Sequence, residues 1–220
     1  IVSGGHTQLV LFHDHGDYKL LGQTQDDAVG EAFDKVAKIL GLPYPGGPSI
    51  ANAAKHGDPR SYHLPIARMA KPYQFSFSGL KTAVLRAVQH AVGKDYTFPS
   101  HELQGLLDDV TRANFAASFQ YTAVKTLVDQ TVAAYEEFQP QSVVIAGGVA
   151  ANQALRSALA ERLPIGIEYA PMSLCTDNAA MVATLGYYYA EKRPAIDPYH
   201  FDVLPSLSMT QTAWNAQEVL

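Results

Sequence analysis

Two short turns in the sequence combine paired glycines with small polar residues. The first, residues 2–7, reads VSGGHT between two predicted strands, and the second, residues 146–152, reads AGGVAAN between a buried strand and a helix. Glycine has no Cβ atom, so backbone N–H groups in such turns can come close to a phosphate or a ribose. A simple chain reversal explains either turn taken alone. Because both turns lie at strand ends within one lobe, we favour a ligand-binding role for the pair.

The second turn offers two further features to a ligand. The helix that begins near Ala151 would place the positive end of its dipole at the turn. Asn152 carries a side-chain amide that can bind a hydroxyl or a carbonyl. A third glycine loop, residues 45–48 (PGGP), gains a functional meaning only beside the first two.

Two aspartates are the main titratable candidates. Asp34 lies one helical turn after Gly30 on the polar face of a predicted helix, where a solvated charge is the default interpretation. Asp177 lies in a polar cluster, residues 173–178 (SLCTDN), that opens a helix directly after a strand. Thr176 could cap this helix, which would leave the Asp177 carboxylate as a hard oxygen ligand for a metal. From the residues alone, capping by Asp177 is slightly favoured over metal binding.

Other candidate sites have weaker support. His13 and His15 flank a turn with no further ligand at a recognised metal spacing, so a solvated turn is favoured. A group of basic and aromatic residues could meet RNA, but this pattern is more common in a partly buried insertion. The group comprises Lys71, Lys81, Arg86, Lys94, Tyr73, Phe75 and Phe77. A hydrolase triad is not supported, because Cys175 has no adjacent histidine and no serine lies in a Gly-x-Ser-x-Gly turn.

The elements that position these residues follow from the spacing of apolar residues. Alternation predicts strands at residues 7–12 and 18–23, and apolar runs after Pro140 predict strands at 142–146 and 165–170. Three- to four-residue spacing predicts helices at 27–40, 49–55, 80–92, 100–139, 152–163 and 176–192. We expect Gly41 to end the first helix and Ser100 to cap the longest one. Residues 43–48, 58–78 and the tail from 194 are expected to be irregular. This order predicts an α/β fold with a mixed sheet flanked by helices.

The composition limits the class of protein. The chain has 220 residues, of which 47% are hydrophobic and 17% charged, so it is globular and forms one large domain or two small lobes. Sixteen basic and 21 acidic residues give a net charge of −5, so nucleic acid would need a local patch or a partner protein. The single Cys175 fits a reducing, cytoplasmic compartment. No apolar run approaches the roughly 20 residues of a membrane span, so we expect no membrane contact.

Together, the motifs resemble those of the TsaD family, the tRNA N6-adenosine threonylcarbamoyltransferases. In the family's order they are residues 2–9 (VSGGHTQL), 30–35 (GEAFDK), 44–48 (YPGGP), 75–82 (FSFSGLKT), 147–152 (GGVAAN) and 175–181 (CTDNAAM). The resemblance extends from residue 1 to about 193 and leaves the tail without a counterpart. It implies an actin/Hsp70-like (ASKHA) fold. Residues 1–170 would form mainly its second lobe, with a helical insertion at about 58–140, and residues 171–220 a return helix and an irregular tail.

The resemblance also implies a reaction and a site. The threonylcarbamoyl group of threonylcarbamoyl-adenylate would pass to the N6 amine of the adenosine beside the anticodon, in tRNAs that read codons beginning with A. The residues implied to hold the adenylate are Ile1, Val2, Ser3, Gly4, Gly5, Asp34, Gly47 and Asn152. Asp177 is implied as a ligand of one metal ion, usually iron (Fe²⁺). The implied partners are tRNA and the proteins TsaB and TsaE, and no residue is an evident general base.

The sequence departs from the family pattern in one respect. The family's other metal ligands are two histidines in a His-x-x-x-His helix ahead of the first glycine turn, and none of the eight histidines here has that spacing. The chain also opens at Ile1, at the end of a predicted strand. We therefore expect an N-terminally truncated fragment that lacks the first lobe and is inactive by itself.

Three alternatives belong to other functional classes. A non-catalytic nucleotide-binding or interaction module is the main one, since an incomplete lobe would have the same sequence features. A metallopeptidase, the older label of the family, would need a complete metal site and a base. An ATP-hydrolysing or sugar-kinase member of the fold would need a carboxylate in its phosphate turn, where Ser3 and His6 stand.

Overall fold

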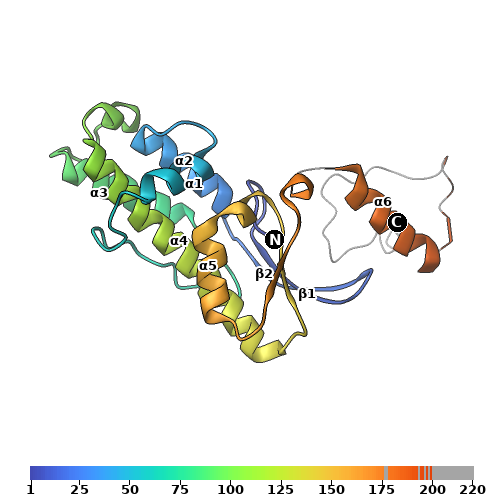
Figure 1. Ribbon diagram of the computed structural model, residues 1–220. Helices are drawn as coiled ribbons and strands as arrows, with labels where there is room; N and C mark the ends of the chain where they lie inside the picture. Colours follow the sequence, from blue (N-terminus) through green and yellow to red (C-terminus); the bar gives the residue numbers. More distant parts are fainter. Residues whose placement is uncertain (176–177, 193, 196, 198, 200–220) are drawn as a thin grey trace.

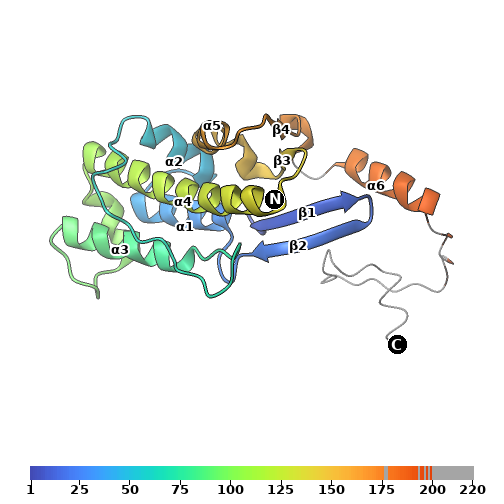
Figure 2. The same ribbon diagram turned by 90° about the horizontal axis from the view of Figure 1, so that it is seen from below.

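The computed structural model describes residues 1–175, 178–192, 194, 195, 197 and 199. Most of this chain forms a helical body, from which a two-stranded hairpin extends toward a separate helix, α6 (Figure 1). A second view shows the longest helix, α4, running along the body, with the hairpin continuing from the body toward α6 (Figure 2). The described chain thus combines helices with small sheets, which confirms the α/β class and shows that helix predominates.

The hairpin consists of β1 (Gln8–Asp14) and β2 (Asp17–Gln23), which pair antiparallel as the alternation predicts. Its inner half is partly buried, whereas Phe12, His13 and Asp14 at the outer end are exposed. The hairpin therefore belongs to the body at one end only.

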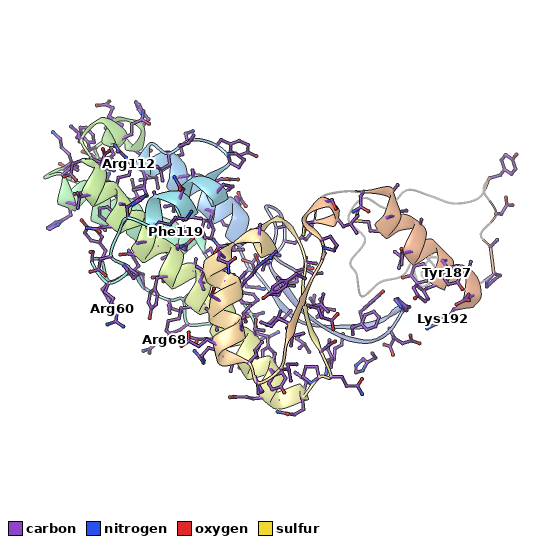
Figure 3. All side chains as sticks on the ribbon, in the orientation of Figure 1. Arg60, Arg68, Arg112, Phe119, Tyr187 and Lys192 are labelled. Carbon is purple, nitrogen blue, oxygen red and sulfur yellow. The ribbon has the colours of Figure 1, made fainter. Side chains whose placement is uncertain are left out.

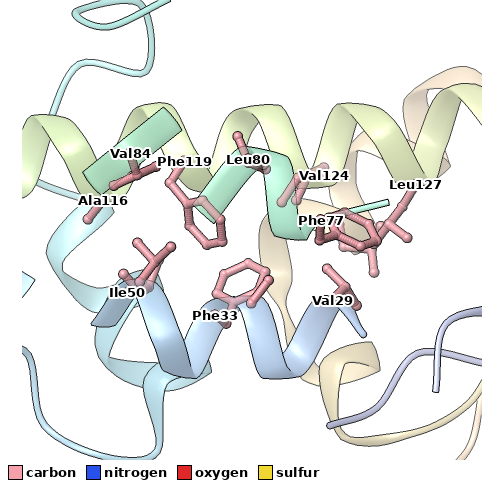
Figure 4. Packing of buried hydrophobic residues seen from close by; sticks show 14 of the residues in the cluster. Val29, Phe33, Ile50, Phe77, Leu80, Val84, Ala116, Phe119, Val124 and Leu127 are labelled. Carbon is pink, nitrogen blue, oxygen red and sulfur yellow. The ribbon is translucent and has the colours of Figure 1, made fainter. Parts of the chain in front are cut away.

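The body is built around helices that apolar spacing predicts. They are α1 (Val29–Leu40), α2 (Gly46–Ala54), α3 (Ser78–Ala91) and α4 (Asp109–Phe138). Phe33 of α1 meets Phe119 of α4 edge to face, with ring centroids 4.9 Å apart, in the centre of the core (Figure 4). Both rings are buried, and each such side chain contributes about 1.5–3 kcal/mol through removal from water. The core therefore fixes α1 against α4.

The boundary of α1 has the predicted cause. Gly41 follows the helix with φ of 71°, and its N–H donates to the carbonyl oxygens of Ala37 and Lys38. A residue with a Cβ atom is disfavoured at this φ, so glycine makes an efficient C-terminal cap here. The predicted cap at Gly41 is confirmed.

The start of the longest helix differs from the prediction. Ser100–Gly105 forms a separate 3₁₀ helix, η1, and α4 begins only after Asp108. The Asp108 carboxylate accepts the N–H of Thr111 at 2.7 Å, which is the bond of an N-terminal cap. The prediction that Ser100 caps this helix is wrong, because burial of Leu103 and Leu107 turns the chain between the two segments.

The glycine loop before α2 also differs from the prediction of irregular structure. The helix begins at Gly46, so the second half of residues 43–48 is its first turn. Pro48 fits there because the first N–H groups of a helix need no partner within the helix. One of these N–H groups, from Gly46, donates to Oδ1 of Asp34 at 2.7 Å. A carboxylate from another helix thus allows the loop to become helical.

The second sheet consists of β3 (Val143–Ile145) and β4 (Ile167–Tyr169), which pair in parallel. The connection between them contains the 3₁₀ helix η2 (Gly148–Ala151) and α5 (Gln153–Arg162). The described residues therefore contain two two-stranded sheets and not the single mixed sheet that we predicted. The strands β3 and β4 have only three residues each, which leaves little edge for further pairing. Gly147, at φ of 100°, ends the extended backbone just after β3. Val2, ahead of β1, links the two regions, because its N–H donates to the carbonyl of Ala146, which follows β3.

The last elements are the 3₁₀ helix η3 (Met172–Leu174) and α6 (Ala179–Lys192). The predicted start of this helix at 176 lies outside the described residues. None of the fourteen residues of α6 is buried. No helix in the described part of the chain is both long and apolar enough to cross a membrane.

Candidate nucleotide-binding site

The structure brings the first two glycine turns together. The N–H of Val2 donates to the carbonyl of Ala146 at 2.8 Å, and the N–H of Val149 donates to the carbonyl of Val2 at 3.1 Å. A Cβ atom on Gly147 would overlap the carbonyl oxygen of Val2. Glycine at this position is therefore required by the close approach of the two backbones, and the turns form one unit.

The start of α1 completes this unit. The N–H of Gly30 donates to the carbonyl of Ser3 at 3.2 Å, and a Cβ atom on Gly30 would lie 2.6 Å from the same oxygen. The buried hydroxyl of Thr7 accepts the N–H of Val29 at 2.8 Å. The first glycine turn is thereby fixed between the second turn and the N-terminal end of α1.

Asp34 lies one helical turn further along α1, and Gly47 lies in the first turn of α2, next to the Gly46 that Asp34 binds. Asp34 is half-buried and binds the N–H of Gly46 with one oxygen, so its other oxygen remains for a ligand. A cavity of about 530 Å³ lies beside this carboxylate. Its lining includes Asp34, Lys38, Tyr44, Gly46 and Gln104. The Asp34 carboxylate is therefore not simply solvated, as its place on a polar helix face would predict, because it also binds the first turn of α2.

Asn152 caps α5 and also contacts α4. Its Oδ1 accepts the N–H of Leu155 at 3.1 Å, and its Nδ2 donates to Oε1 of Gln120 at 2.9 Å. Sequence reasoning missed Gln120, because its partner lies 32 residues away and α4 shows no chemical motif. Its one signal is a polar side chain next to Phe119 in the buried stripe of a long helix.

The glycines of the site fall into two groups. Gly30, Gly46 and Gly147 face backbone atoms at close range. Gly4, Gly5, Gly47 and Gly148 have open space where a Cβ atom would lie. The second group gives a ligand room to approach the backbone of all three loops.

The N–H groups of the first turn are less open than the sequence predicts. Those of Gly5 and His6 donate to Oγ of Ser3, at 3.3 and 3.0 Å. Ser3 Oγ thus accepts two bonds, and its own proton remains to be donated. In this structure the first turn therefore offers a hydroxyl donor as well as open backbone.

The motif at residues 75–82 lies outside the glycine turns. Ser76 and Ser78 donate their hydroxyls to Oδ2 of Asp26 at 2.6 Å, and the N–H of Phe77 donates to Oδ1 at 2.8 Å. Burial alone would raise the pKa of Asp26, but these bonds stabilise the carboxylate and lower its pKa overall. Sequence reasoning missed Asp26, which attaches the start of α3 to the base of the hairpin.

The weaker candidates have structural explanations. The ring of His15 stacks on Tyr188, with centroids 3.4 Å apart. Arg86 donates to the carbonyl of Tyr96, and Lys94 lies 4.9 Å from the ring centre of Phe98. The contacts of Arg86 and Lys94 agree with the partly buried insertion that we favour. The stacking of His15 on Tyr188 shows that the turn of His13 and His15 is not simply solvated.

The described residues do not supply a metal site. They contain no group of three or more His, Cys, Asp or Glu side chains that could hold an ion. Asp177, the one predicted ligand, lies outside the described residues. The described side chains therefore do not form a metal centre by themselves. The role of Asp177 as a metal ligand stays a prediction.

Comparison with known proteins identifies the family. A family model for tRNA N6-adenosine threonylcarbamoyltransferase (TsaD) matches residues 1–184. A protein of that name from Thermomicrobium roseum is 49% identical over 199 residues, which cover 87% of this chain and 54% of the relative. Another from Gloeobacter violaceus is 50% identical over 186 residues, covering 84% and 51%.

A more extensive match comes from Dehalococcoides mccartyi, whose protein of the same name is 46% identical over 211 residues. This match covers 95% of the chain and 59% of the relative. The chain thus spans about half the length of the relatives it matches. The extent of the family match and these identities show that the chain belongs to the TsaD family of tRNA N6-adenosine threonylcarbamoyltransferases.

Proposed function

We propose that this chain contributes the adenylate-binding part of an enzyme that transfers a threonylcarbamoyl group to tRNA. The donor is threonylcarbamoyl-adenylate, and the acceptor is N6 of the adenosine beside the anticodon in tRNAs that read codons beginning with A. The observation that carries the proposal is the direct hydrogen bonding of the two glycine turns, in a chain of this family, against the start of α1.

The groups around these turns suit the parts of an adenylate. Open glycine backbone at Gly4, Gly5 and Gly148, beside Ile1, Val2 and Ser3, gives the phosphate room to approach. The uncommitted oxygen of Asp34 suits ribose hydroxyls, because a carboxylate accepts the hydrogen bonds that they donate. Gly47, which follows the partner of Asp34, and the Asn152 amide are the remaining groups that we propose for the ligand.

The reaction is an acyl-type transfer. The N6 amine attacks the carbamoyl carbonyl carbon, a C–N bond forms, the C–O bond to the phosphate breaks, and AMP leaves with the bonding electrons. The amine gives up one proton to solvent or to the leaving phosphate. AMP is a good leaving group, so the main contribution of this chain is to position the adenylate.

Other components remain part of the proposal. An iron ion held by Asp177 would polarise the carbonyl, but no step here is assigned to it, because the described residues do not form its site. TsaB and TsaE are proposed partners, in agreement with a net charge of −5, which disfavours tRNA binding by this chain alone. We propose a cytoplasmic location.

The test is calorimetric titration of AMP into the protein. We expect binding that weakens about tenfold or more in Asn152→Ala and Asp34→Ala, as expected when hydrogen bonds to a bound ligand are lost. Gly186→Ala is the control, because a Cβ atom there meets no neighbour and the residue lies on α6. Equal affinity in all four proteins would refute the proposed site.

A turnover assay with tRNA, threonylcarbamoyl-adenylate, TsaB and TsaE tests the reaction. We infer that the 220-residue polypeptide alone forms no product, because its histidines lack the His-x-x-x-His spacing of the family's metal site. Robust product from the purified polypeptide would overturn this inference. Tight AMP binding without product, even from a longer protein with both histidines, would favour the non-catalytic module.

A further inference from the structure

Among the described residues, Gln120, on α4, is the one side chain outside the glycine turns that binds the Asn152 amide directly. We propose that Gln120 is a positioning residue, which fixes the orientation of the Asn152 amide toward the adenylate. This inference rests on the proposed function, because it assumes that Asn152 contacts the ligand.

The Asn152 amide has a hydrogen-bond partner at each of its two ends. Its oxygen accepts the N–H of Leu155 at 3.1 Å, and its nitrogen donates to Oε1 of Gln120 at 2.9 Å. A half-turn of the amide would place its N–H₂ against the N–H of Leu155 and its oxygen against the oxygen of Gln120. Both contacts would then pair like with like, so the two partners together select one orientation.

The support for Gln120 is rigid. The residue is half-buried on α4 and follows Phe119, which is 0% exposed in the centre of the core. On its other side, Gln120 lines a groove of about 410 Å³ between α4 and α5, together with Ala117, Ala154 and Ala158. Small side chains on both helices let α4 and α5 lie close enough for the hydrogen bond to form. Because the core fixes α4, it also fixes the Gln120 side chain that binds the Asn152 amide.

The orientation has a chemical consequence. The Asn152 oxygen already accepts a hydrogen bond at the start of α5, and one of the two N–H groups already donates to Gln120. The remaining N–H group is a donor, so it selects an acceptor on the ligand. On an adenylate such an acceptor is a ribose oxygen, a phosphate oxygen or the carbamoyl carbonyl oxygen.

Three substitutions of Gln120 separate positioning from packing. Gln120→Glu keeps an acceptor at the same reach, Gln120→Leu removes it, and Gln120→Lys replaces it with a donor. Gln153→Leu is the matched control, because Gln153 is an exposed glutamine next to Asn152 whose side chain donates to Ser157 instead. AMP affinity by calorimetry and the Asn152 side-chain amide signals by NMR are measured for each protein.

We expect Gln120→Leu to weaken AMP binding about five- to tenfold, the effect of one lost hydrogen bond. Gln120→Lys weakens it at least as much, while Gln120→Glu and Gln153→Leu stay within about twofold of the unchanged protein. The Asn152 amide signals shift in the Leu and Lys variants even without AMP. If one Gln120 variant fails to fold, the other two are compared instead. Their AMP affinities must still follow the expected order, in which Gln120→Glu binds AMP more tightly than either Gln120→Leu or Gln120→Lys.

Three results would overturn the inference, and they differ in meaning. If Asn152→Ala weakens AMP binding but Gln120→Leu and Gln120→Lys do not, the site stands and Gln120 has no positioning role. If Asn152→Ala leaves AMP binding unchanged, Asn152 does not contact the ligand, and the proposed site fails together with this inference. Unchanged Asn152 signals in Gln120→Leu also contradict the inference, whatever the affinity.

Discussion

The helical body and α6 have similar apolar sequences but different surroundings. In the body, Phe33, Phe115 and Phe119 are almost fully buried where α1 and α4 meet. In α6, Met181, Val182 and Leu185 are 40–64% exposed. Figure 3 shows Phe119 inside the body, and Tyr187 and Lys192 at the opposite end of the molecule. Apolar composition alone therefore does not determine which helix is part of a core.

The contacts that position α6 come from the tip of the hairpin. His15 stacks on Tyr188, the Lys192 ammonium pairs with Asp14, and the same ammonium donates to the carbonyl of His15 at 2.9 Å. Asp14 and Lys192 are exposed, and His15 and Tyr188 are only partly buried, so each contact contributes little compared with core burial. We therefore expect the body to carry the cooperative stability and α6 to open locally at low cost.

The largest difference between the regions should come from truncating apolar side chains. Phe119→Ala removes a ring that contacts Phe33, and we expect it to lower the free energy of unfolding by about 3–5 kcal/mol. Leu185→Ala on α6 should change it by less than about 0.5 kcal/mol, because Leu185 is already 40% exposed. Denaturant titration followed by circular dichroism measures both. Similar losses in the two variants would mean that α6 belongs to the same cooperative unit as the body.

A second pair of variants compares the space around two glycines. Gly147→Ala places a methyl group against the carbonyl of Val2 at φ of 100°, and we expect a loss of about 1–3 kcal/mol. Gly186→Ala on α6 meets no neighbouring atom and should favour that helix by up to about 1 kcal/mol. Thermal unfolding of both proteins provides the measurement. A Gly147→Ala protein as stable as the parent would show that the two glycine turns are not closely packed.

The sequence predicts the helices of the body well because their signals are local. The three- to four-residue apolar spacing of α4 and the cap at Gly41 depend on residues within one or two turns of each other, and both signals are confirmed. The cap by Ser100 is wrong because the decisive event is burial of Leu103 and Leu107, which only the tertiary core determines.

The site shows the same limit more clearly. The pattern of glycines predicts each turn, but nothing local predicts that Val2 bonds to Ala146, 144 residues away. The helical start at Gly46 depends on a carboxylate from α1, and the orientation of Asn152 depends on Gln120. Long-range hydrogen bonds of this kind leave no periodic signal, so the sequence predicts the turns but not the partners that their residues bind.

Acid should affect the body through Asp26. Hydrogen bonds from Ser76, Ser78 and Phe77 lower the pKa of this carboxyl below 3.8, against the opposing effect of burial. A lowered folded-state pKa adds stability that is complete above the unfolded-state value and is lost as the pH falls through the folded-state value. Asp26→Asn should cost about 1 kcal/mol near neutral pH and reduce the slope of stability below pH 4. Unfolding titrations from pH 7 to pH 3 test this, and parallel curves for the two proteins would contradict it.

The smallest effect should appear at the exposed pair between Asp14 and Lys192. The hydrogen bond from Lys192 lowers the pKa of Asp14, so the pair is lost as the pH falls through that lowered value. At neutral pH, added salt should weaken this ion pair and so speed hydrogen exchange in α6. The reason is that the screening length shrinks from about 10 Å at 0.1 M to about 3 Å at 1 M. Asp14→Asn should speed hydrogen exchange in α6 by a few-fold at most and leave α4 unchanged. In the Asn variant the added salt should have no further effect on α6, since the screened charge is already gone. If salt still speeds exchange in α6 of that variant, another charged contact holds the helix, and the hairpin tip is not its main anchor.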